Sequence, residues 1–273
     1  MSDELPPLRE VIARHDLGAN KAFGQHFLLD LNITRKIARA AGAGAGDTII
    51  EVGPGPGGLT RALLETGAAV IAVERDRRFI PALEELQAAF PGALRIVETD
   101  ALHADERALA NGARVKIVSN LPYNISTELL VKWLTANHGD APLWPQMTLM
   151  FQKEVADRIL APPGSKTYGR LSVIAQAASR PRRAFDLPAR AFTPPPKVVS
   201  TVVAFEPAPA PLANIAKLEQ VTQAAFSQRR KMLRSSLKPL FGADAESRLD
   251  AIGIAPTKRA EEISVEDFLR LAR

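Results

Sequence analysis

The sequence predicts an α/β fold, in which a doubly wound and mainly parallel β-sheet is followed by a small C-terminal helical domain. Short apolar runs recur along much of the chain, and several segments between them carry apolar residues at helical spacing. Beyond about residue 209 the helical spacing continues to the end. Strands that are apolar along their whole length are buried on both faces, so we expect helices on both sides of the sheet.

Apolar runs predict five strands, at residues 48–52, 69–74, 94–98, 115–119 and 147–151. Apolar residues at helical spacing predict a helix after each of the first two strands and another at about residues 171–178. Residues 198–205 predict a late strand, placed at an edge of the sheet or as a hairpin partner.

The proline-rich segment 207–211 predicts a stiff linker, because proline favours extended geometry and cannot pair within a sheet. We therefore expect a larger domain at residues 1–207 and a helical domain at residues 208–273. Near the end of the chain, Ser264 and Asp267 match a helix capping box, and Ile263 is placed to pack on Phe268.

The composition is that of an ordinary globular protein, with 46% hydrophobic and 24% charged residues. The chain has no cysteine, which excludes disulfides and thiolate metal sites, and its four histidines show no metal-ligand spacing, so no metal is expected. The first residues carry acids and prolines in place of a signal peptide, and no apolar stretch reaches transmembrane length, which predicts a soluble cytoplasmic protein. The net charge of +5 permits a polyanionic partner without requiring one.

A glycine-rich loop follows the first predicted strand and opens a helix. Gly53, Gly55 and Gly58 fit the G-x-G-x-x-G pattern of dinucleotide-binding folds, and Glu74 ends the next strand at a suitable separation to bind a ribose hydroxyl pair. Glycines let the backbone approach a ligand closely, and the helix N-terminus offers unpaired N–H groups. For this loop alone, NAD-dependent hydride transfer and a plain tight turn are both open alternatives.

Three further features favour S-adenosylmethionine over NAD. Glu51 lies directly before the glycines, where it would repel a pyrophosphate but attract a sulfonium-bearing amino acid. Asp100 follows the third predicted strand, where it can accept a hydrogen bond from an adenine amino group. The downstream segment 120–126 supplies no acid or base for hydride transfer. The alternative for Glu74 and Asp100 is that they are solvated acids at strand ends.

Residues 120–126 read Asn-Leu-Pro-Tyr-Asn-Ile-Ser, at the carboxyl end of a predicted buried strand, where open α/β sheets bind their ligands. The Asn120 side-chain oxygen and the Leu121 carbonyl can accept two hydrogen bonds from an amine, Pro122 stiffens the turn, and Tyr123 offers a stacking face. Together they suit a planar base that carries an exocyclic amino group. The alternative is an ordinary strand-to-helix turn.

The exocyclic amino group of a base is a poor nucleophile because its lone pair is delocalised into the ring. Acceptors placed off the base plane favour a pyramidal nitrogen whose lone pair points at the methyl group. A sulfonium is already a good leaving group, so alignment is the main requirement and no base is needed before attack. A base that is stacked in a folded nucleic acid must first leave its stack and be held by aromatic faces.

Several short sequence blocks, and their order along the chain, resemble those of the KsgA-type small-subunit ribosomal RNA adenine dimethyltransferases. Relatives of that family include the Erm-type large-subunit methyltransferases. The similarity covers most of the chain and rests on residues 21–30, 51–60, 120–126, 152–155, 165–173, 191–198 and 226–231. The resemblance implies a Rossmann-like class I methyltransferase sheet, S-adenosylmethionine as cofactor, and dimethylation of two adjacent adenosines in a hairpin loop near the 3′ end of small-subunit (16S) ribosomal RNA. It also implies a monomer that acts on this RNA within an immature ribosomal subunit and has a role in subunit biogenesis.

The resemblance also implies roles for individual residues. It places Gln25, His26 and Leu28 over the methionine portion of the cofactor, and it assigns the remaining cofactor contacts to Gly53, Gly55, Glu74, Asp100 and Asn120, with Glu74 on the ribose and Asp100 on the adenine. It places Asn120, Leu121, Tyr123 and Phe192 around the target base. Many family members carry asparagine where this chain has His26. Phe192 has an alternative interpretation as a core residue fixed by the neighbouring prolines.

Four basic residues of the predicted helical domain are candidates for RNA contact, namely Arg229, Arg230, Lys231 and Arg234. Basic runs are more often solvated faces. The resemblance favours phosphate contact instead, with a salt-dependent affinity as its signature. The basic string at residues 180–183 has the same two interpretations.

Three other functions are alternatives on the sequence alone. An Erm-type enzyme would share the catalytic residues, but the full C-terminal domain and the long block at residues 24–27 argue against it. Glu51 and the Asn-Leu-Pro-Tyr segment disfavour an NAD-dependent oxidoreductase. The intact Asn120 and Glu74 disfavour a non-catalytic ribosome-assembly factor that keeps the fold only for binding.

Overall fold

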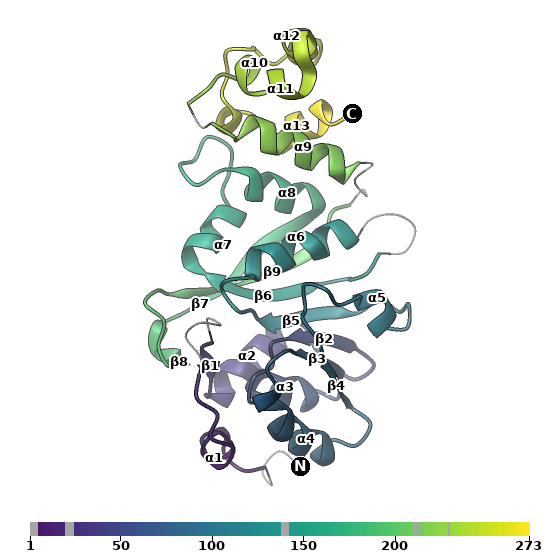
Figure 1. The fold of residues 1–273 in the computed structure, drawn as a ribbon, viewed down its shortest axis with the longest axis vertical. Helices are drawn as coiled ribbons and strands as arrows, with labels where there is room; N and C mark the ends of the chain where they lie inside the picture. The colour runs from purple at the N-terminus through teal and green to yellow at the C-terminus, as the bar shows by residue number, and fades with distance from the viewer. Residues whose placement is uncertain (1–4, 20–24, 138–141, 210–211, 213, 229) are drawn as a thin grey trace.

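The computed structural model describes residues 5–19, 25–137, 142–209, 212, 214–228 and 230–273, and it is built around a seven-stranded sheet (Figure 1). The strand order is β4-β3-β2-β5-β6-β9-β7, in which the strands from β4 to β6 are parallel and β9 runs antiparallel to both of its neighbours. The strands are β2 (Thr48–Val52), β3 (Ala69–Glu74), β4 (Leu94–Glu98), β5 (Lys116–Asn120), β6 (Met147–Gln152), β7 (Ser179–Leu187) and β9 (Ser200–Pro207). The predicted α/β fold is confirmed.

The five strands predicted from apolar runs are present, and their ends agree with the prediction to within one residue. Of the two placements expected for the late strand, the edge is wrong, because β9 lies between β6 and β7. Its antiparallel pairing with β7 agrees with the other placement, as a hairpin partner. The sequence analysis missed β7, whose residues Arg180, Pro181, Arg182 and Arg183 read as a solvated basic string. An edge strand tolerates proline and charge because one side of its backbone faces solvent.

Helices cover both faces of the sheet, as the uniformly apolar strands predict. Adjacent residues of one strand enter different cores: Ile50 and Ile117 belong to one cluster, whereas Ile49 and Val118 belong to another. The first cluster is closed by α5 (Glu106–Leu109), α6 (Ser126–Ala136), α7 (Lys153–Ile159) and α8 (Arg170–Ala178), and the second by α2 (Leu31–Ala40), α3 (Gly58–Leu64) and α4 (Ile80–Ala89). With both faces buried, polar residues of the strands are concentrated at the sheet's open ends.

The C-terminal helices form a layer at the end of the molecule opposite α1 (Leu8–Arg14) (Figure 1). They are α9 (Ile215–Ala225), α10 (Leu233–Ser236), α11 (Lys238–Phe241), η5 (Gly242–Asp244), α12 (Ala245–Ala251), η6 (Ala260–Glu262) and α13 (Val265–Leu271). The predicted capping box is present, with Ser264 N donating to Asp267 Oδ2 at 3.0 Å and Asp267 N donating to Ser264 Oγ at 3.1 Å. Ile263 and Phe268 are both buried in the same core.

Helix α8 belongs to two cores at once. Leu171 and Ile174 face the sheet, while Val173 and Ala177 join the core of the C-terminal helices. The expected boundary between residues 207 and 208 coincides with the end of β9, and residues 210 and 211 of the expected linker lie outside the described part of the chain. The helical layer is therefore fixed to the sheet by burial, and the division into two domains stays a prediction.

A second, two-stranded sheet joins segments that are far apart in the sequence. Here β1 (Phe27–Leu28) pairs antiparallel with β8 (Phe192–Thr193), which follows η4 (Ala189–Ala191). The remaining elements are α1 (Leu8–Arg14) and η3 (Arg77–Phe79). Within the described ranges, no helix has the length and apolar character needed to cross a membrane, and no group of acidic and histidine side chains is arranged to hold a metal ion.

A buried polar cluster holds the loop that follows β4. Glu106 Oε1 accepts hydrogen bonds from Trp133 Nε1 at 2.7 Å and from Lys132 Nζ at 2.8 Å. Lys132 Nζ also donates to the carbonyls of Ala101 and Ala104, at 2.8 and 2.6 Å. The cluster thereby ties this loop, which carries Asp100, to α6.

Glu106→Ala is expected to lower the free energy of unfolding by about 2–3 kcal/mol, because it leaves an ammonium and a buried indole N–H without their acceptor. Chemical denaturation measures this value. Glu98→Ala is the control: it removes a carboxylate on the protein surface that pairs with exposed Arg77 and should change stability by less than about 0.5 kcal/mol. Equal reductions in stability for the two variants would show that the cluster does not stabilise the loop.

Candidate functional site

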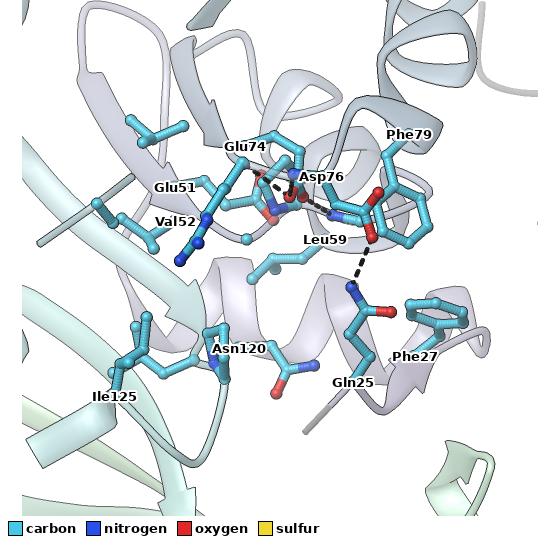
Figure 2. Close-up of a pocket in the computed structure, with 18 of the residues that line it drawn as sticks. Gln25, Phe27, Glu51, Val52, Leu59, Glu74, Asp76, Phe79, Asn120 and Ile125 are labelled. Atoms are coloured by element: carbon cyan, nitrogen blue, oxygen red, sulfur yellow. Dashed lines mark hydrogen bonds between the residues drawn. The ribbon is translucent and has the colours of Figure 1, made fainter. Parts of the chain in front are cut away.

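The carboxyl ends of β2, β3 and β5, together with the loop after β4, open into a cavity of about 330 Å³ (Figure 2). Parallel strands bring their carboxyl ends to one edge of the sheet, which is where open α/β folds bind ligands. The wall comes from five segments, within residues 25–28, 51–59, 73–79, 99–102 and 120–125. The structure thus brings together all eight residues predicted to hold the cofactor and three of the four predicted to surround a base.

The glycine loop forms the floor beside β2. Gly53 and Gly55 have φ angles of 66° and 54°, in the left-handed region that favours glycine. A Cβ atom on Gly58 would lie 2.5 Å from the Leu28 carbonyl oxygen, so only glycine lets α3 begin against β1. Gly53 and Gly55 line the cavity, as predicted.

Glu74, at the end of β3, is held by three backbone donors. Its Oε2 accepts from Gly55 N at 3.1 Å, and its Oε1 accepts from Arg75 N and Asp76 N at 2.9 and 2.8 Å. Burial nevertheless raises the pKa of this carboxyl, and the three backbone N–H groups oppose the rise. The side chain is 6% exposed, so its orientation toward the cavity is fixed by the loop itself.

Glu51, at the end of β2, is the most buried acid of the cavity. Burial raises the pKa of this carboxyl to about 8, the neighbouring Thr60 side chain opposes the rise, and the nearby Glu74 adds to it. In the described part of the chain, neither Glu51 Oε2 nor the adjacent Thr60 Oγ1 has a hydrogen-bond partner. With a pKa of about 8 this carboxyl is mainly protonated at neutral pH, and a cation beside it would favour its ionised form. A buried polar atom without a partner is unfavourable, so Glu51 Oε2 marks a place for a cationic or hydrogen-bonding ligand group.

Two further acids lie at the rim. Asp100 Oδ2 accepts from Arg75 Nη1 at 2.8 Å, and Asp100 Oδ1 accepts from Leu102 N at 3.0 Å. Asp76, which the sequence analysis missed although it lies two residues beyond Glu74, accepts from Gln25 Nε2 at 3.2 Å (Figure 2). Its bonds to Arg78 hold the pKa of the Asp76 carboxyl below its usual range, in spite of partial burial.

The Asn120 amide lies across the cavity from the acids (Figure 2). Its Nδ2 donates to the His26 carbonyl at 3.0 Å, so the amide oxygen is left as the acceptor. The Pro122 ring approaches to 3.4 Å of the position that a Cβ on Gly53 would occupy. The Asn-Leu-Pro-Tyr loop therefore packs directly on the glycine loop, with the Leu121 side chain buried beneath it.

The ring of Tyr123 lines the same cavity and is fixed at both ends. Its hydroxyl lies 2.6 Å from Ser200 Oγ, and its ring centroid lies 5.4 Å from that of His26. Ser200 was missed because a lone serine at the start of a strand carries no functional signal in the sequence. Burial raises the pKa of the Tyr123 hydroxyl, so it stays protonated at neutral pH.

His26 is expected to cover the methionine portion of a cofactor, and in the structure its side chain is held by two contacts with other parts of the chain. Its Nδ1 donates to the Pro194 carbonyl at 2.8 Å, and its ring packs on Tyr123. The residue lines the cavity, yet its ring joins the Asn-Leu-Pro-Tyr loop to the segment after β8. Its contact with a cofactor stays a prediction.

Phe192 also differs from the expectation of an aromatic face on the target base. The ring is 2% exposed and lies in the core with Leu28 and Leu187, and it does not belong to the cavity wall. The reason is the pairing of β8 with β1, which turns Phe192 inward opposite Leu28. In this conformation the core interpretation describes Phe192, and a contact with a base stays a prediction.

The predicted RNA-contacting residues lie in the helical layer, away from the cavity wall. Arg230, Lys231 and Arg234 are exposed, and Arg234 Nη1 lies 3.8 Å from Glu246 Oε1 in a surface ion pair. Arg229 lies outside the described residues. On β7, Arg183 pairs with Asp157 and Asp186, at 2.5 and 2.8 Å.

Comparison with known proteins gives close relatives over the whole chain. Residues 17–273 match the family model described as Ribosomal RNA adenine dimethylase. A protein of Phenylobacterium zucineum named Ribosomal RNA small subunit methyltransferase A is 60% identical over 99% of this chain and 93% of its own length. The protein of the same name from Mesorhizobium japonicum is 58% identical over 98% of both chains.

Two solved structures are similar in fold. A dimethyladenosine transferase from Plasmodium falciparum has a TM-score of 0.75 at 26% identity, over 90% of this chain and 96% of its own. The 23S rRNA methyltransferase ErmE has a TM-score of 0.67 at 25% identity, over 90% of this chain and 98% of its own. The expected Rossmann-like class I methyltransferase sheet with a helical C-terminal part is confirmed. Together with the family match, these similarities show that the chain belongs to the ribosomal RNA adenine dimethylase family.

Proposed function

We propose that this chain transfers methyl groups from S-adenosylmethionine to the exocyclic amino groups of two adjacent adenosines in a hairpin loop near the 3′ end of 16S ribosomal RNA. The observation that carries the proposal is the packing of the Asn-Leu-Pro-Tyr loop on the glycine loop, with Pro122 against Gly53. This contact sets an acceptor for an amino group directly beside a cavity lined by carboxylates.

The cavity fits a cationic amino-acid nucleoside better than a dinucleotide. Its walls carry Glu74 and Asp100, whose carboxylates would repel a pyrophosphate. A positive group beside the unpartnered Oε2 of Glu51 would lower the raised pKa of that acid and pair with its carboxylate. We assign Glu74 to the ribose hydroxyls and Asp100 to the adenine amino group, with the backbone of Gly53 and Gly55 beneath. When bound, S-adenosylmethionine supplies an electrophilic methyl group on a sulfonium.

The chain's own residues prepare the target nitrogen. Asn120 is held by its bond to the His26 carbonyl, so its Oδ1 and the Leu121 carbonyl can accept the two N–H groups of an adenine. These bonds favour a pyramidal nitrogen with its lone pair free for attack, which is electrostatic preorganisation. Tyr123 stacks on the base and excludes water from one face. The proton released after transfer is acidic and needs no dedicated base.

The choice of the small subunit is supported by the relatives at 58–60% identity, which are named for that substrate, whereas ErmE is 25% identical. We propose that residues 1–207 form the catalytic domain and that residues 208–273 form an RNA- and ribosome-binding domain. The enzyme acts as a metal-free cytoplasmic monomer on the RNA of an immature subunit. Binding to that RNA explains why the helical layer carries basic residues outside the cavity wall.

Methyl transfer to purified ribosomal particles tests the function. Immature small subunits that lack the modification, incubated with labelled S-adenosylmethionine and this protein, are expected to yield dimethyladenosine in 16S RNA by mass spectrometry. Label only in large-subunit RNA would indicate an Erm-type activity instead. Subunit binding without any methyl transfer would indicate a non-catalytic assembly factor.

Glu74→Gln is expected to weaken S-adenosylmethionine binding by about 1–3 kcal/mol, because it replaces one fixed carboxylate oxygen with a donor that faces backbone N–H groups. Calorimetry measures the affinity. Glu98→Gln is the matched control, since Glu98 lies opposite Glu74 in the register of β3 and β4 but outside the cavity wall. Unchanged affinity in Glu74→Gln, or tight binding of NAD to the wild type, would contradict the assignment.

Asn120→Asp is expected to lower the methyl-transfer rate by about a hundredfold at neutral pH, as for removal of one preorganised transition-state hydrogen bond. The introduced carboxylate has no proton to give to the His26 carbonyl, so it turns or repels that oxygen. Activity should partly recover as the pH falls toward 5, because a protonated acid can donate again. Asn111→Asp, an exposed control, should behave as wild type. A rate for Asn120→Asp that matches this control would leave the loop with a structural role only.

Replacing Arg230, Lys231 and Arg234 together with alanine should weaken binding to the small subunit and flatten its salt dependence. The slope of log affinity against log salt concentration should fall by roughly 0.9 for each phosphate that the variant no longer neutralises. Filter binding across a salt series measures both quantities. Cofactor affinity should not change, because these side chains lie outside the cavity wall. An unaltered slope would identify the three residues as a solvated face. Replacement of the exposed Arg9 and Arg39 with alanine is the control, because it also removes positive charges from the surface.

A further inference from the structure

The hydroxyl of Tyr123 is hydrogen-bonded to a residue of β9. It lies 2.6 Å from the Oγ of Ser200, which is fully buried and is the first residue of that strand. Ser200 pairs with Gln152 of β6 on one side and with Leu187 of β7 on the other. Its position is therefore set by two neighbouring strands, so the far end of the tyrosine is attached to the sheet.

The ring of Tyr123 is held on its other side by His26. The two ring centroids are 5.4 Å apart, with 33° between the ring planes. The imidazole is itself fixed, because its Nδ1 donates to the Pro194 carbonyl at 2.8 Å. One face of the tyrosine is thus supported by an imidazole, and its hydroxyl by a buried serine, while the ring remains part of the cavity wall.

This support matters most for the second of two methyl transfers. After the first transfer the target nitrogen carries one N–H and one methyl group. The Asn120 side-chain oxygen and the Leu121 carbonyl can then no longer both accept a hydrogen bond from it. The base must then be kept in the stacked position with fewer hydrogen bonds, while a methyl occupies space where a hydrogen was. A tyrosine that can tilt would enter that space, and a displacement of about 1 Å is enough to slow a transfer about a hundredfold.

We propose that Ser200 is a positioning residue that acts through Tyr123 to make the second methylation efficient. The inference rests on the proposed function, in which Tyr123 stacks on the target adenine. Ser200 does not line the cavity and reaches the reaction only through the tyrosine hydroxyl. It therefore determines the product, dimethyladenosine or monomethyladenosine, and does not determine cofactor binding.

The alternative is that Ser200 only satisfies a buried hydroxyl and stabilises the fold. The two roles differ in the ratio of products, which a decrease in stability alone does not change. Ser179→Ala is a matched control, because Ser179 is also a buried serine at the start of a strand next to β9. Its Oγ donates to the Ala175 carbonyl at 2.6 Å and has no contact with Tyr123.

The experiment measures monomethyladenosine and dimethyladenosine over time in small subunits treated with each variant, together with the melting temperature and the affinity for S-adenosylmethionine. For Ser200→Ala we expect unchanged cofactor affinity, a first transfer slowed less than about threefold, and a second transfer slowed by about tenfold or more, so that monomethyladenosine accumulates. Tyr123→Phe breaks the same hydrogen bond from the other side and should give the same ratio. The double variant should be no worse than either single variant, because both changes remove the same bond.

Several results would overturn the inference. A wild-type product ratio in both Ser200→Ala and Tyr123→Phe would show that the hydrogen bond does not control the second transfer. Additive effects in the double variant would show that the two residues act separately, and the same shift in Ser179→Ala would assign it to general destabilisation. Failure of the proposed function looks different: Tyr123→Ala would leave both transfers unaffected, or the wild type would transfer no methyl group. If Ser200→Ala does not fold, Tyr123→Phe alone decides.

Discussion

The site depends on one constraint, which is that both faces of the parallel sheet are buried. Residues of β2 and β5 alternate between two apolar cores, so a polar side chain on these strands has a place only at a strand end. Glu74 and Asn120 are the last residues of β3 and β5, and Glu51 is the last but one of β2, so each lies at a carboxyl end. Since those ends meet at one edge in a parallel sheet, the three side chains converge without any long-range signal in the sequence.

Three acidic side chains around one cavity are costly to bury close together, and each of them is stabilised to a different extent. Glu74 receives three backbone N–H groups, Asp100 pairs with Arg75 at the rim, and Glu51 is left with one oxygen unpaired and a pKa raised to about 8 by burial. A ligand that brings a positive group beside Glu51 relieves the least satisfied of the three. The same field opposes polyphosphate, so the charge distribution selects between two nucleoside cofactors that the glycine loop alone cannot distinguish.

The sequence was informative where local pattern decides the structure. The parallel strands, the glycine loop and the strand-end acids follow from apolar runs and the residues that end them, so their positions could be predicted closely. The orientations of His26 and Phe192 could not, because they depend on the pairing of β1 with β8, two short segments distant in the chain. Strand β7 was hidden for another reason, since an edge strand can carry the charges that usually indicate a loop. The role of Ser200 depends on its contact with Tyr123, and no spacing in the sequence predicts that contact.

The helical layer is tied to the catalytic sheet through α8 and not merely through the segment after β9. Val173 and Ala177 of this helix are buried among the C-terminal helices, while Leu171 and Ile174 are buried against the sheet. Rotating the layer would expose both sets, at a cost of roughly 25 cal/mol for each Å² of apolar surface. The basic residues of the layer are consequently held at a fixed position relative to the cavity. An RNA that contacts both the basic residues and the cavity must hold its adenosines at a fixed distance from the bound phosphates. The shape of the folded RNA therefore contributes to specificity even where no base is read.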